Sequence, residues 1–77
     1  MFRKWHIRWR NKKSAKRLGW KPEWFGAINF DNHLIKRIKR FQKKYNLKSD
    51  GICDTLTYRI LVFKRRRFMK KIKAKEN

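Results

Sequence analysis

The apolar positions of residues 32–45 recur at offsets of three, four and seven residues, which is the spacing of one face of an α-helix. Lysine and arginine fill most of the positions between them. Asp31 or Asn32 can cap the N-terminus of this helix, and Asn46 can end it. The expected apolar face consists of Leu34, Ile35, Ile38, Phe41 and Tyr45. The pattern therefore predicts an amphipathic helix with one strongly basic face, and it makes Phe41 a central core residue.

Shorter helices are predicted on both sides of this element. Residues 13–18 form a short helix that ends at Gly19, since glycine readily takes the left-handed conformation found at helix C-termini. A third helix begins near Asp54 or Thr55 and continues into the basic segment 64–77. The inward face expected for this third helix consists of Leu56, Ile60, Leu61 and Phe63.

The periodicity of residues 1–13 fits a strand and a helix equally well, so we expect an extended or partly helical arm there. The 77 residues suit a single domain. Three short helices joined by loops make the fold class all-α, a small three-helix domain with basic N- and C-terminal arms. The expected limits are 1–13 for the basic aromatic arm, 14–63 for the domain and 64–77 for the basic amphipathic tail. We expect residues 14–63 to fold without either arm.

The excess of basic over acidic residues adds a second feature to this picture. The sequence has 25 Lys and Arg against 5 Asp and Glu, which gives a net charge of +20. The basic face of residues 32–45 contains no acid, so its cations repel one another until a polyanion binds them. The residues expected to bind a polyanion are Arg3, Lys4, Arg8, Arg10, Lys36, Arg37, Lys39, Arg40, Lys43, Lys44, Lys64, Arg65, Arg66 and Arg67.

The sequence lacks the patterns that are typical of an enzyme or a metal centre, and we expect no catalytic residue and no cofactor. His6 and His33 lie in different segments, without the short spacing of a metal-ligand pair. Cys53 is the only cysteine, so we expect a small buried apolar residue rather than a disulfide. No apolar run is long enough to span a membrane, and the first residues lack the apolar core of a secretory signal peptide.

Residues 41–61, FQKKYNLKSDGICDTLTYRIL, contain the most specific motif of the chain. Asp50-Gly51 predicts a tight turn, because glycine permits a positive φ and aspartate bonds nearby backbone N–H groups. The order Phe-Gln, Leu, Asp-Gly-Ile, Thr-Tyr, Leu resembles the peptidoglycan-binding-like domain, a three-helix module often attached to bacterial and phage cell-wall hydrolases. The resemblance covers roughly residues 14–63. The matching positions are Phe41, Gln42, Leu47, Asp50, Gly51, Ile52, Thr57, Tyr58 and Leu61.

The resemblance implies a non-catalytic module that binds peptidoglycan. The sequence departs from the family pattern at the two turns, where GAINFDN at 26–32 and Asp54-Thr55 replace the usual Gly-Pro forms. Tryptophan rings can stack on sugar rings, although packing in the core or at its rim is the other explanation for Trp20 and Trp24. The candidate glycan-binding residues are Trp20, Trp24, Asp50 and Tyr58.

Three functions fit these features. The first is a peptidoglycan-binding module of phage or bacterial origin that acts within a larger assembly, while its arms hold other anionic polymers. The second is a nucleic-acid-binding protein whose arms follow the phosphates of DNA or RNA. The third is a small structural subunit of a virion or ribonucleoprotein, in contact with neighbouring subunits. The expected location is a phage particle or the bacterial cytoplasm.

Overall fold

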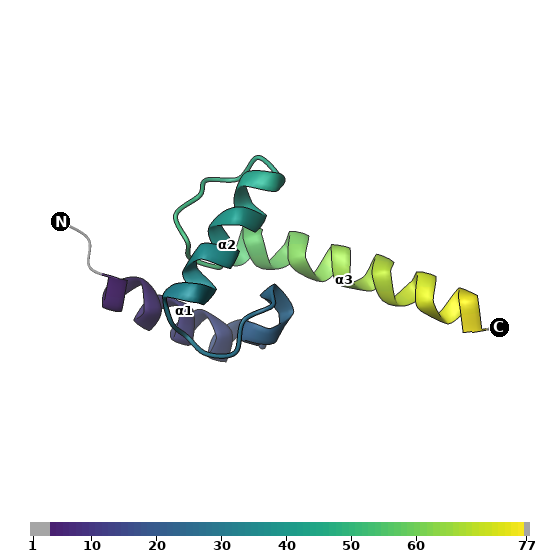
Figure 1. Cartoon of the computed structure of the whole chain (residues 1–77), viewed down its shortest axis with the longest axis horizontal. Coiled ribbons are helices and arrows are strands. Elements are labelled where there is room, and N and C mark those ends of the chain that lie inside the picture. Colours follow the sequence, from purple (N-terminus) through teal and green to yellow (C-terminus); the bar gives the residue numbers. More distant parts are fainter. Residues whose placement is uncertain (1–3, 77) are drawn as a thin grey trace.

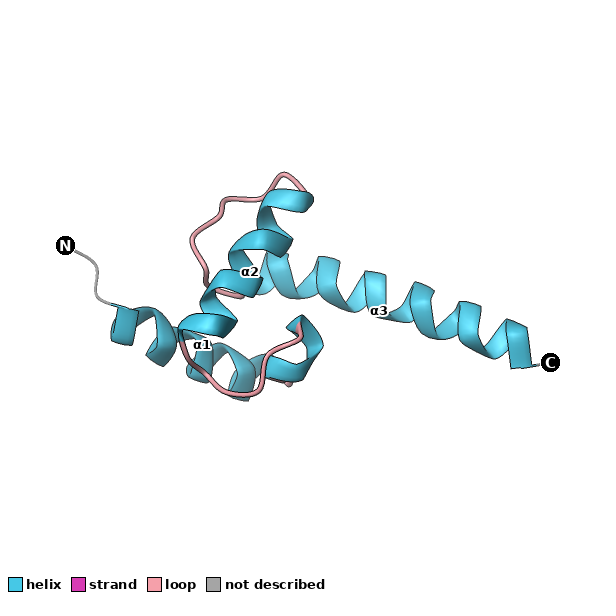
Figure 2. Cartoon of the chain, in the orientation of Figure 1, coloured by secondary structure: helices cyan, strands magenta, loops and turns pink. Residues whose placement is uncertain are grey.

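The computed structural model describes the backbone of residues 4–76 and the side chains of residues 6–66. The described chain consists of helices α1 (Lys4–Leu18), α2 (Asn32–Lys44) and α3 (Thr55–Glu76), with a short 3-10 helix η1 (Pro22–Phe25) after α1. Figure 1 shows the C-terminal half of α3 projecting beyond the other helices, and Figure 2 shows that loops make all the connections. The prediction of an all-α domain with three helices is confirmed.

The first helix is much longer than the short helix predicted over residues 13–18. It begins at Lys4 and runs without a break across the expected limit between residues 13 and 14. Among the side chains of this helix that the structure describes, residues 6–18, the buried ones are Asn11, Ser14 and Ala15. They are small or polar, so an analysis based on large apolar side chains does not detect the buried face. Of the two forms expected for the N-terminal segment, the helical one is therefore observed for residues 4–13, and Asn11 places part of it in the core.

The helix ends use the caps that the sequence predicts. Asp31 caps α2, and its carboxylate accepts a hydrogen bond from the backbone N–H of Leu34 at 3.1 Å. Asp54 plays the same part at α3, where it accepts a bond from Thr57 N at 2.9 Å. Asn46 follows α2 with a φ of 58°. Aspartates at these positions satisfy backbone donors that the first helical turn leaves free.

The core lies where α1, η1, α2 and α3 meet. Trp20 packs edge-on against Phe25, with ring centroids 5.4 Å apart. Phe41 is only half-buried and lies at the rim of the core, so the prediction that it is central was wrong. The buried apolar cluster consists of Ala15, Trp20, Phe25, Ala27, Leu34, Ile38, Cys53 and Leu61.

The inward face of α3 also differs from the prediction. Leu56 and Phe63 are 55% and 56% exposed, whereas Thr57 and Leu61 are buried. Both pairs have a helical spacing, so α3 carries two adjacent stripes and only one of them faces the core. The assignment of Leu56 and Phe63 to the inward face was therefore wrong.

The loop before α3 is held from both sides by buried amide side chains. Gln42 of α2 accepts a hydrogen bond from Gly51 N at 3.0 Å and donates to the carbonyl of Ile52 at 2.9 Å. Asn11 of α1 accepts a bond from Cys53 N at 2.9 Å and donates to the carbonyl of Gly51 at 3.0 Å. We call residues 50–53 the clamped loop, because these bonds join α1 and α2 through it.

Two residues of the clamped loop behave as the sequence predicts. Gly51 has a φ of 79°, and a Cβ there would lie 2.8 Å from Cγ2 of Ile35, so both backbone conformation and space require glycine. Cys53 is fully buried, and burial raises the pKa of its thiol to about 12, with a smaller contribution from the Asp54 carboxylate. Its predicted role as a small buried apolar residue is confirmed.

Candidate ligand-binding groove

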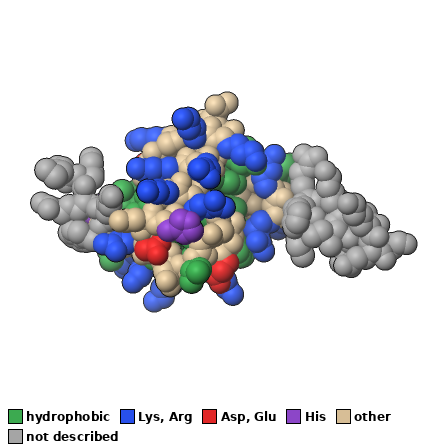
Figure 3. Space-filling view, in the orientation of Figure 1, with side chains coloured by type: hydrophobic (Ala, Val, Ile, Leu, Met, Phe, Trp, Pro, Cys, Tyr) green, Lys and Arg blue, Asp and Glu red, His purple; other side chains and the backbone are tan. Residues whose placement is uncertain are grey.

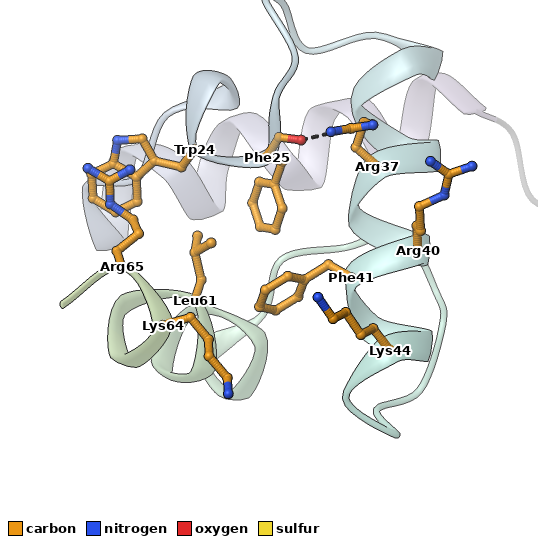
Figure 4. A pocket seen from close by; sticks show the side chains of 9 residues that line it. All are labelled: Trp24, Phe25, Arg37, Arg40, Phe41, Lys44, Leu61, Lys64 and Arg65. Atoms are coloured by element: carbon orange, nitrogen blue, oxygen red, sulfur yellow. Dashed lines mark hydrogen bonds between the residues drawn. The ribbon is translucent and has the colours of Figure 1, made fainter. Parts of the chain in front are cut away.

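A groove of about 480 Å³ lies between η1, α2 and the first half of α3. Figure 4 shows that rings and one aliphatic side chain form its floor and that long cationic side chains surround them. The helices place these groups together because residues spaced by three and four positions share one helix face. The groove is lined by Trp24, Phe25, Arg37, Arg40, Phe41, Lys44, Leu61, Lys64 and Arg65.

The floor of the groove is apolar and comes from three different elements. Phe25 of η1 and Leu61 of α3 are buried, and Phe41 of α2 is half-buried. The rings of Phe25 and Phe41 meet edge to face, with centroids 5.5 Å apart. Because the floor is also one wall of the core, its shape is fixed by the same packing that holds the helices together.

The rim of the groove carries five cations, and its lining contains no acidic residue. Arg37 is held in place by a hydrogen bond from its Nε to the carbonyl of Phe25, at 2.9 Å. Gly26 allows this approach, since a Cβ at that position would lie 2.6 Å from Nη2 of Arg37. The Nε bond leaves the terminal nitrogens of the guanidinium available to a ligand.

Two further rim cations lie over aromatic rings. The guanidinium of Arg65 lies 4.1 Å from the ring centroid of Trp24, and the amine of Lys64 lies 4.9 Å from that of Tyr45. Cation–π contacts of this kind restrict flexible side chains without neutralising their charge. The groove is therefore suited to an anionic group that is attached to an apolar or ring-shaped body.

Across the described side chains, no three His, Cys, Asp or Glu residues come together in a way that suits a metal ion. Among the helices of residues 4–76, none combines the length and apolarity needed to cross a lipid bilayer.

The four candidate glycan-binding residues do not form one site. Trp20 is 2% exposed and donates its indole N–H to Ser14 Oγ at 3.0 Å, so it belongs to the core and its assignment as a ligand residue is corrected. The Asp50 carboxylate accepts bonds from Gln42 and Ile52 N, both at 3.0 Å, which gives it a role in the turn. Tyr58 is half-buried and packs against the core. Trp24 alone lines the groove.

The cations expected to bind a polyanion divide into several groups. Arg37, Arg40, Lys44, Lys64 and Arg65 meet around the groove. Lys36, Lys39 and Lys43 are exposed on α2, and Arg66 is exposed on α3. Arg8 and Arg10 lie on α1, away from the groove. Arg3 lies outside the described residues, as do the side chains of Lys4 and Arg67.

Sequence reasoning missed the floor of the groove as a site. Leu61 was expected only as a core residue, and Phe25 was not singled out. The signal that was available is Phe25-Gly26, an aromatic residue followed by glycine, which places a ring next to an exposed turn. That signal is weak because the partners of Phe25 come from α2 and α3, far along the chain.

The family comparison matches the part of the chain that builds this groove, apart from Lys64 and Arg65. A family model described as "Putative peptidoglycan binding domain" matches residues 16–61, which is more than half of the chain. The match includes all of η1 and α2 and the start of α3. No curated protein and no solved structure gives a significant match to the chain.

Proposed function

The chain belongs to the family of peptidoglycan-binding domains, and from that premise we propose that it binds peptidoglycan through the groove between η1, α2 and α3. Members of this family are binding modules that are often found beside catalytic domains. The observation that supports the groove as the site is its combination of an apolar floor with five cations and no acid. The proposed role is therefore recognition without catalysis.

The chemistry of peptidoglycan suits both parts of the groove. Its sugar rings and alanine methyl groups present apolar faces, which can lie against Phe25, Phe41 and Leu61. Its short peptides carry free carboxylates, which can pair with the guanidinium groups of Arg37 and Arg65. Guanidinium is planar and binds a carboxylate through two parallel hydrogen bonds, so a positioned arginine adds specificity as well as attraction.

The first prediction concerns two rim cations. We expect the double variant Arg40→Gln/Lys44→Gln to reduce retention on purified peptidoglycan from which other wall polymers have been removed. Both residues are exposed, so the helix should be kept while two cations of the groove are lost. A weakening of about tenfold is expected, from roughly 0.7 kcal/mol for each lost ion pair. The measurement is co-sedimentation over a series of salt concentrations.

Lys16→Gln/Lys21→Gln is the matched control, because both lysines are exposed and neither lines the groove. It lowers the net charge by the same amount as the rim variant. Equal losses in the two variants would contradict a role for the groove. Retention that disappears at moderate salt in the wild-type chain would show that charge alone accounts for binding.

We also propose that the protein acts inside a larger assembly, in a phage particle or a bacterial cell. The exposure of Leu56 and Phe63 on α3 supports this role, since both are large apolar side chains on one helix face. A neighbouring subunit that packs against α3 would bury them. Size-exclusion chromatography of the chain with fractions of its source particle tests this association.

Nucleic-acid binding is the second candidate function, and the net charge of +20 is the observation that favours it. Phosphate contacts make such binding strongly dependent on salt. A titration with DNA and RNA over a salt series separates this candidate from the first. A slope near zero in a plot of log affinity against log salt would remove it.

A further inference from the structure

The cations of α2 form a continuous band around the exposed side of the helix. Successive residues of an α-helix are turned by about 100°. On that geometry, the six cations of α2 follow one another around the helix over an arc of about 160°, and no apolar or acidic residue comes between them. In order around the helix, this basic arc consists of Lys39, Lys43, Lys36, Arg40, Lys44 and Arg37. Figure 3 shows many Lys and Arg side chains gathered over the upper and middle part of the molecule, with the visible acids below them.

Each end of the basic arc opens into a groove. Arg40, Lys44 and Arg37 line the groove described above. Lys39, at the other end, lines a second groove of about 410 Å³ between α1 and the loop before α3. This second groove has Ile7 and Ile52 in its lining. The two grooves and the arc therefore make one basic track that passes over α2.

The second groove continues the positive charge of the arc. Its lining includes Arg10 and Lys48 in addition to Lys39. Asp50 also lines it, but the Asp50 carboxylate is bonded to Gln42 and to Ile52 N in the turn. A polymer with a regular series of negative charges could thus contact cations in both grooves and on the arc between them.

The curvature of the track selects among polyanions. An α-helix with its side chains is only about 10–12 Å wide, so a polymer that follows the track must bend within that distance. Duplex DNA has a persistence length of about 50 nm and bends over so short a span only at a large energetic cost. The track therefore suits a flexible single chain.

The aromatic residues near the track argue against a strand that carries bases. Proteins that bind single-stranded nucleic acid stack bases on open aromatic rings. Beside the first groove, Arg65 lies over Trp24 at 4.1 Å from the ring centroid and Lys64 over Tyr45 at 4.9 Å. Along the arc itself, the exposed His33 is the one ring, between Arg40 and Lys44. Phosphate groups have many partners along the track, whereas bases have few.

We propose that the basic track over α2 binds a flexible phosphodiester polymer without bases, such as a polyol phosphate chain of the cell wall. The track shares Arg37, Arg40 and Lys44 with the proposed peptidoglycan contact but extends beyond it, because Lys36 and Lys43 line neither groove. The two activities can therefore be separated by substitution.

The test uses the double variant Lys36→Gln/Lys43→Gln and a synthetic poly(glycerol phosphate) as the probe. Both lysines are exposed, and glutamine is a good helix former, so circular dichroism should be unchanged. We expect affinity for the probe at low salt to fall by about tenfold. The slope of log affinity against log salt should fall by about 1.4, because each contact with a flexible chain contributes roughly 0.7.

Three comparisons decide the outcome. Lys16→Gln/Lys21→Gln removes the same charge from surfaces outside the track, and Lys36→Arg/Lys43→Arg keeps the charge of the arc; both should bind the probe like the wild-type chain. Equal weakening in the two glutamine variants would overturn the proposal. Tighter binding of oligothymidylate with the same number of phosphates would make nucleic acid the occupant and would overturn it too.

The proposed peptidoglycan contact is tested separately in the same experiment. Peptidoglycan freed of phosphate polymers should be retained equally by Lys36→Gln/Lys43→Gln and by the wild-type chain. If the wild-type chain does not bind this peptidoglycan, the proposed function is wrong, but the proposed phosphodiester site is unaffected. If the wild-type chain binds peptidoglycan but not poly(glycerol phosphate), the phosphodiester proposal is wrong and the proposed function is unaffected.

Discussion

Gln42 is the residue on which the clamped loop depends most. It is 1% exposed, and its side-chain nitrogen lies within hydrogen-bond distance of Asp50 Oδ1, the Ile52 carbonyl and Thr57 Oγ1. Its oxygen accepts the N–H of Gly51. Both ends of a buried amide are thus used, which joins α2 to the loop and to α3. Glutamine fits because it has a donor and an acceptor and carries no charge to bury.

We expect Gln42→Met to lower the free energy of unfolding by about 2–4 kcal/mol. Methionine has a similar length, so the change removes the hydrogen bonds and leaves little cavity. The cost arises because Gly51 N–H and the Ile52 carbonyl lose their partner in a buried site. Urea denaturation of the variant and of the wild-type chain measures the difference.

Lys43→Met provides the control, since it places the same side chain at the next, exposed position of α2. Its effect should lie within about 0.5 kcal/mol. Similar stabilities for Gln42→Met and Lys43→Met would show that the amide bonds do not stabilise the loop in solution.

The caps and the turn could be predicted from sequence because they are local. Asp31, Asp54 and Gly51 each act on backbone groups within a few residues, so short patterns identify them. Trp20 and Phe41 could not be placed in the same way. Which of the two rings is buried depends on the packing of η1 and α2, and that packing has no signature in the local sequence.

At the scale of elements, α1 shows where the expected domain limit fails. Asn11 lies in the segment that was expected to be an arm, yet it is fully buried and bonds Gly51 and Cys53. Ser14, one turn later, donates to the carbonyl of Cys53. The N-terminal helix thus closes one side of the clamped loop, while Gln42 closes the other.

We expect deletion of residues 1–13 to abolish cooperative unfolding. The deletion removes most of α1 together with Asn11, and the backbone groups of Gly51 and Cys53 then have no partner in a buried site. A domain of this size has only a small margin of stability to absorb that loss. Circular dichroism during thermal unfolding is the measurement.

Two point variants separate the role of Asn11 from the loss of helix length. Asn11→Ala should lower the free energy of unfolding by about 2–4 kcal/mol, because two buried backbone groups lose their bonds. Lys12→Ala, at an exposed position of the same helix, should have little effect. A truncated chain that still unfolds cooperatively would restore residues 14–63 as the independent domain.

The groove could be predicted in part. Its cations were identified individually, since a basic helix face is visible in the sequence. Their meeting around Phe25, Phe41 and Leu61 was not, because it depends on which stripe of α3 turns inward. Leu56 and Phe63, seven positions apart, are more hydrophobic than Thr57 and Leu61, four positions apart, yet the less apolar pair is buried and Gln42 donates a hydrogen bond to Thr57 Oγ1.

At the scale of the whole molecule, the charge of +20 is not offset by the acids of the described chain. Asp31 and Asp54 bond backbone N–H groups at helix starts, and Asp50 holds a turn. Their positions serve local structure and leave the basic arc of α2 without counter-charges in its own helix. Folding therefore concentrates cations that the unfolded chain keeps further apart.

This imbalance predicts that salt stabilises the protein. Raising NaCl from about 20 mM to about 500 mM shortens the Debye length from roughly 20 Å to roughly 4 Å, which screens the repulsion among surface cations. We expect the urea midpoint to rise, with a gain of about 1–2 kcal/mol in the free energy of unfolding. The variant in which Lys16, Lys21, Lys36 and Lys43 are all replaced by Gln should gain less, since four of the repelling charges are gone. A midpoint that falls with salt, or an equal gain in both chains, would mean that repulsion does not limit the fold. In that case, a bound polyanion would stabilise the protein only through its contacts, and not by reducing repulsion among the cations of the free molecule.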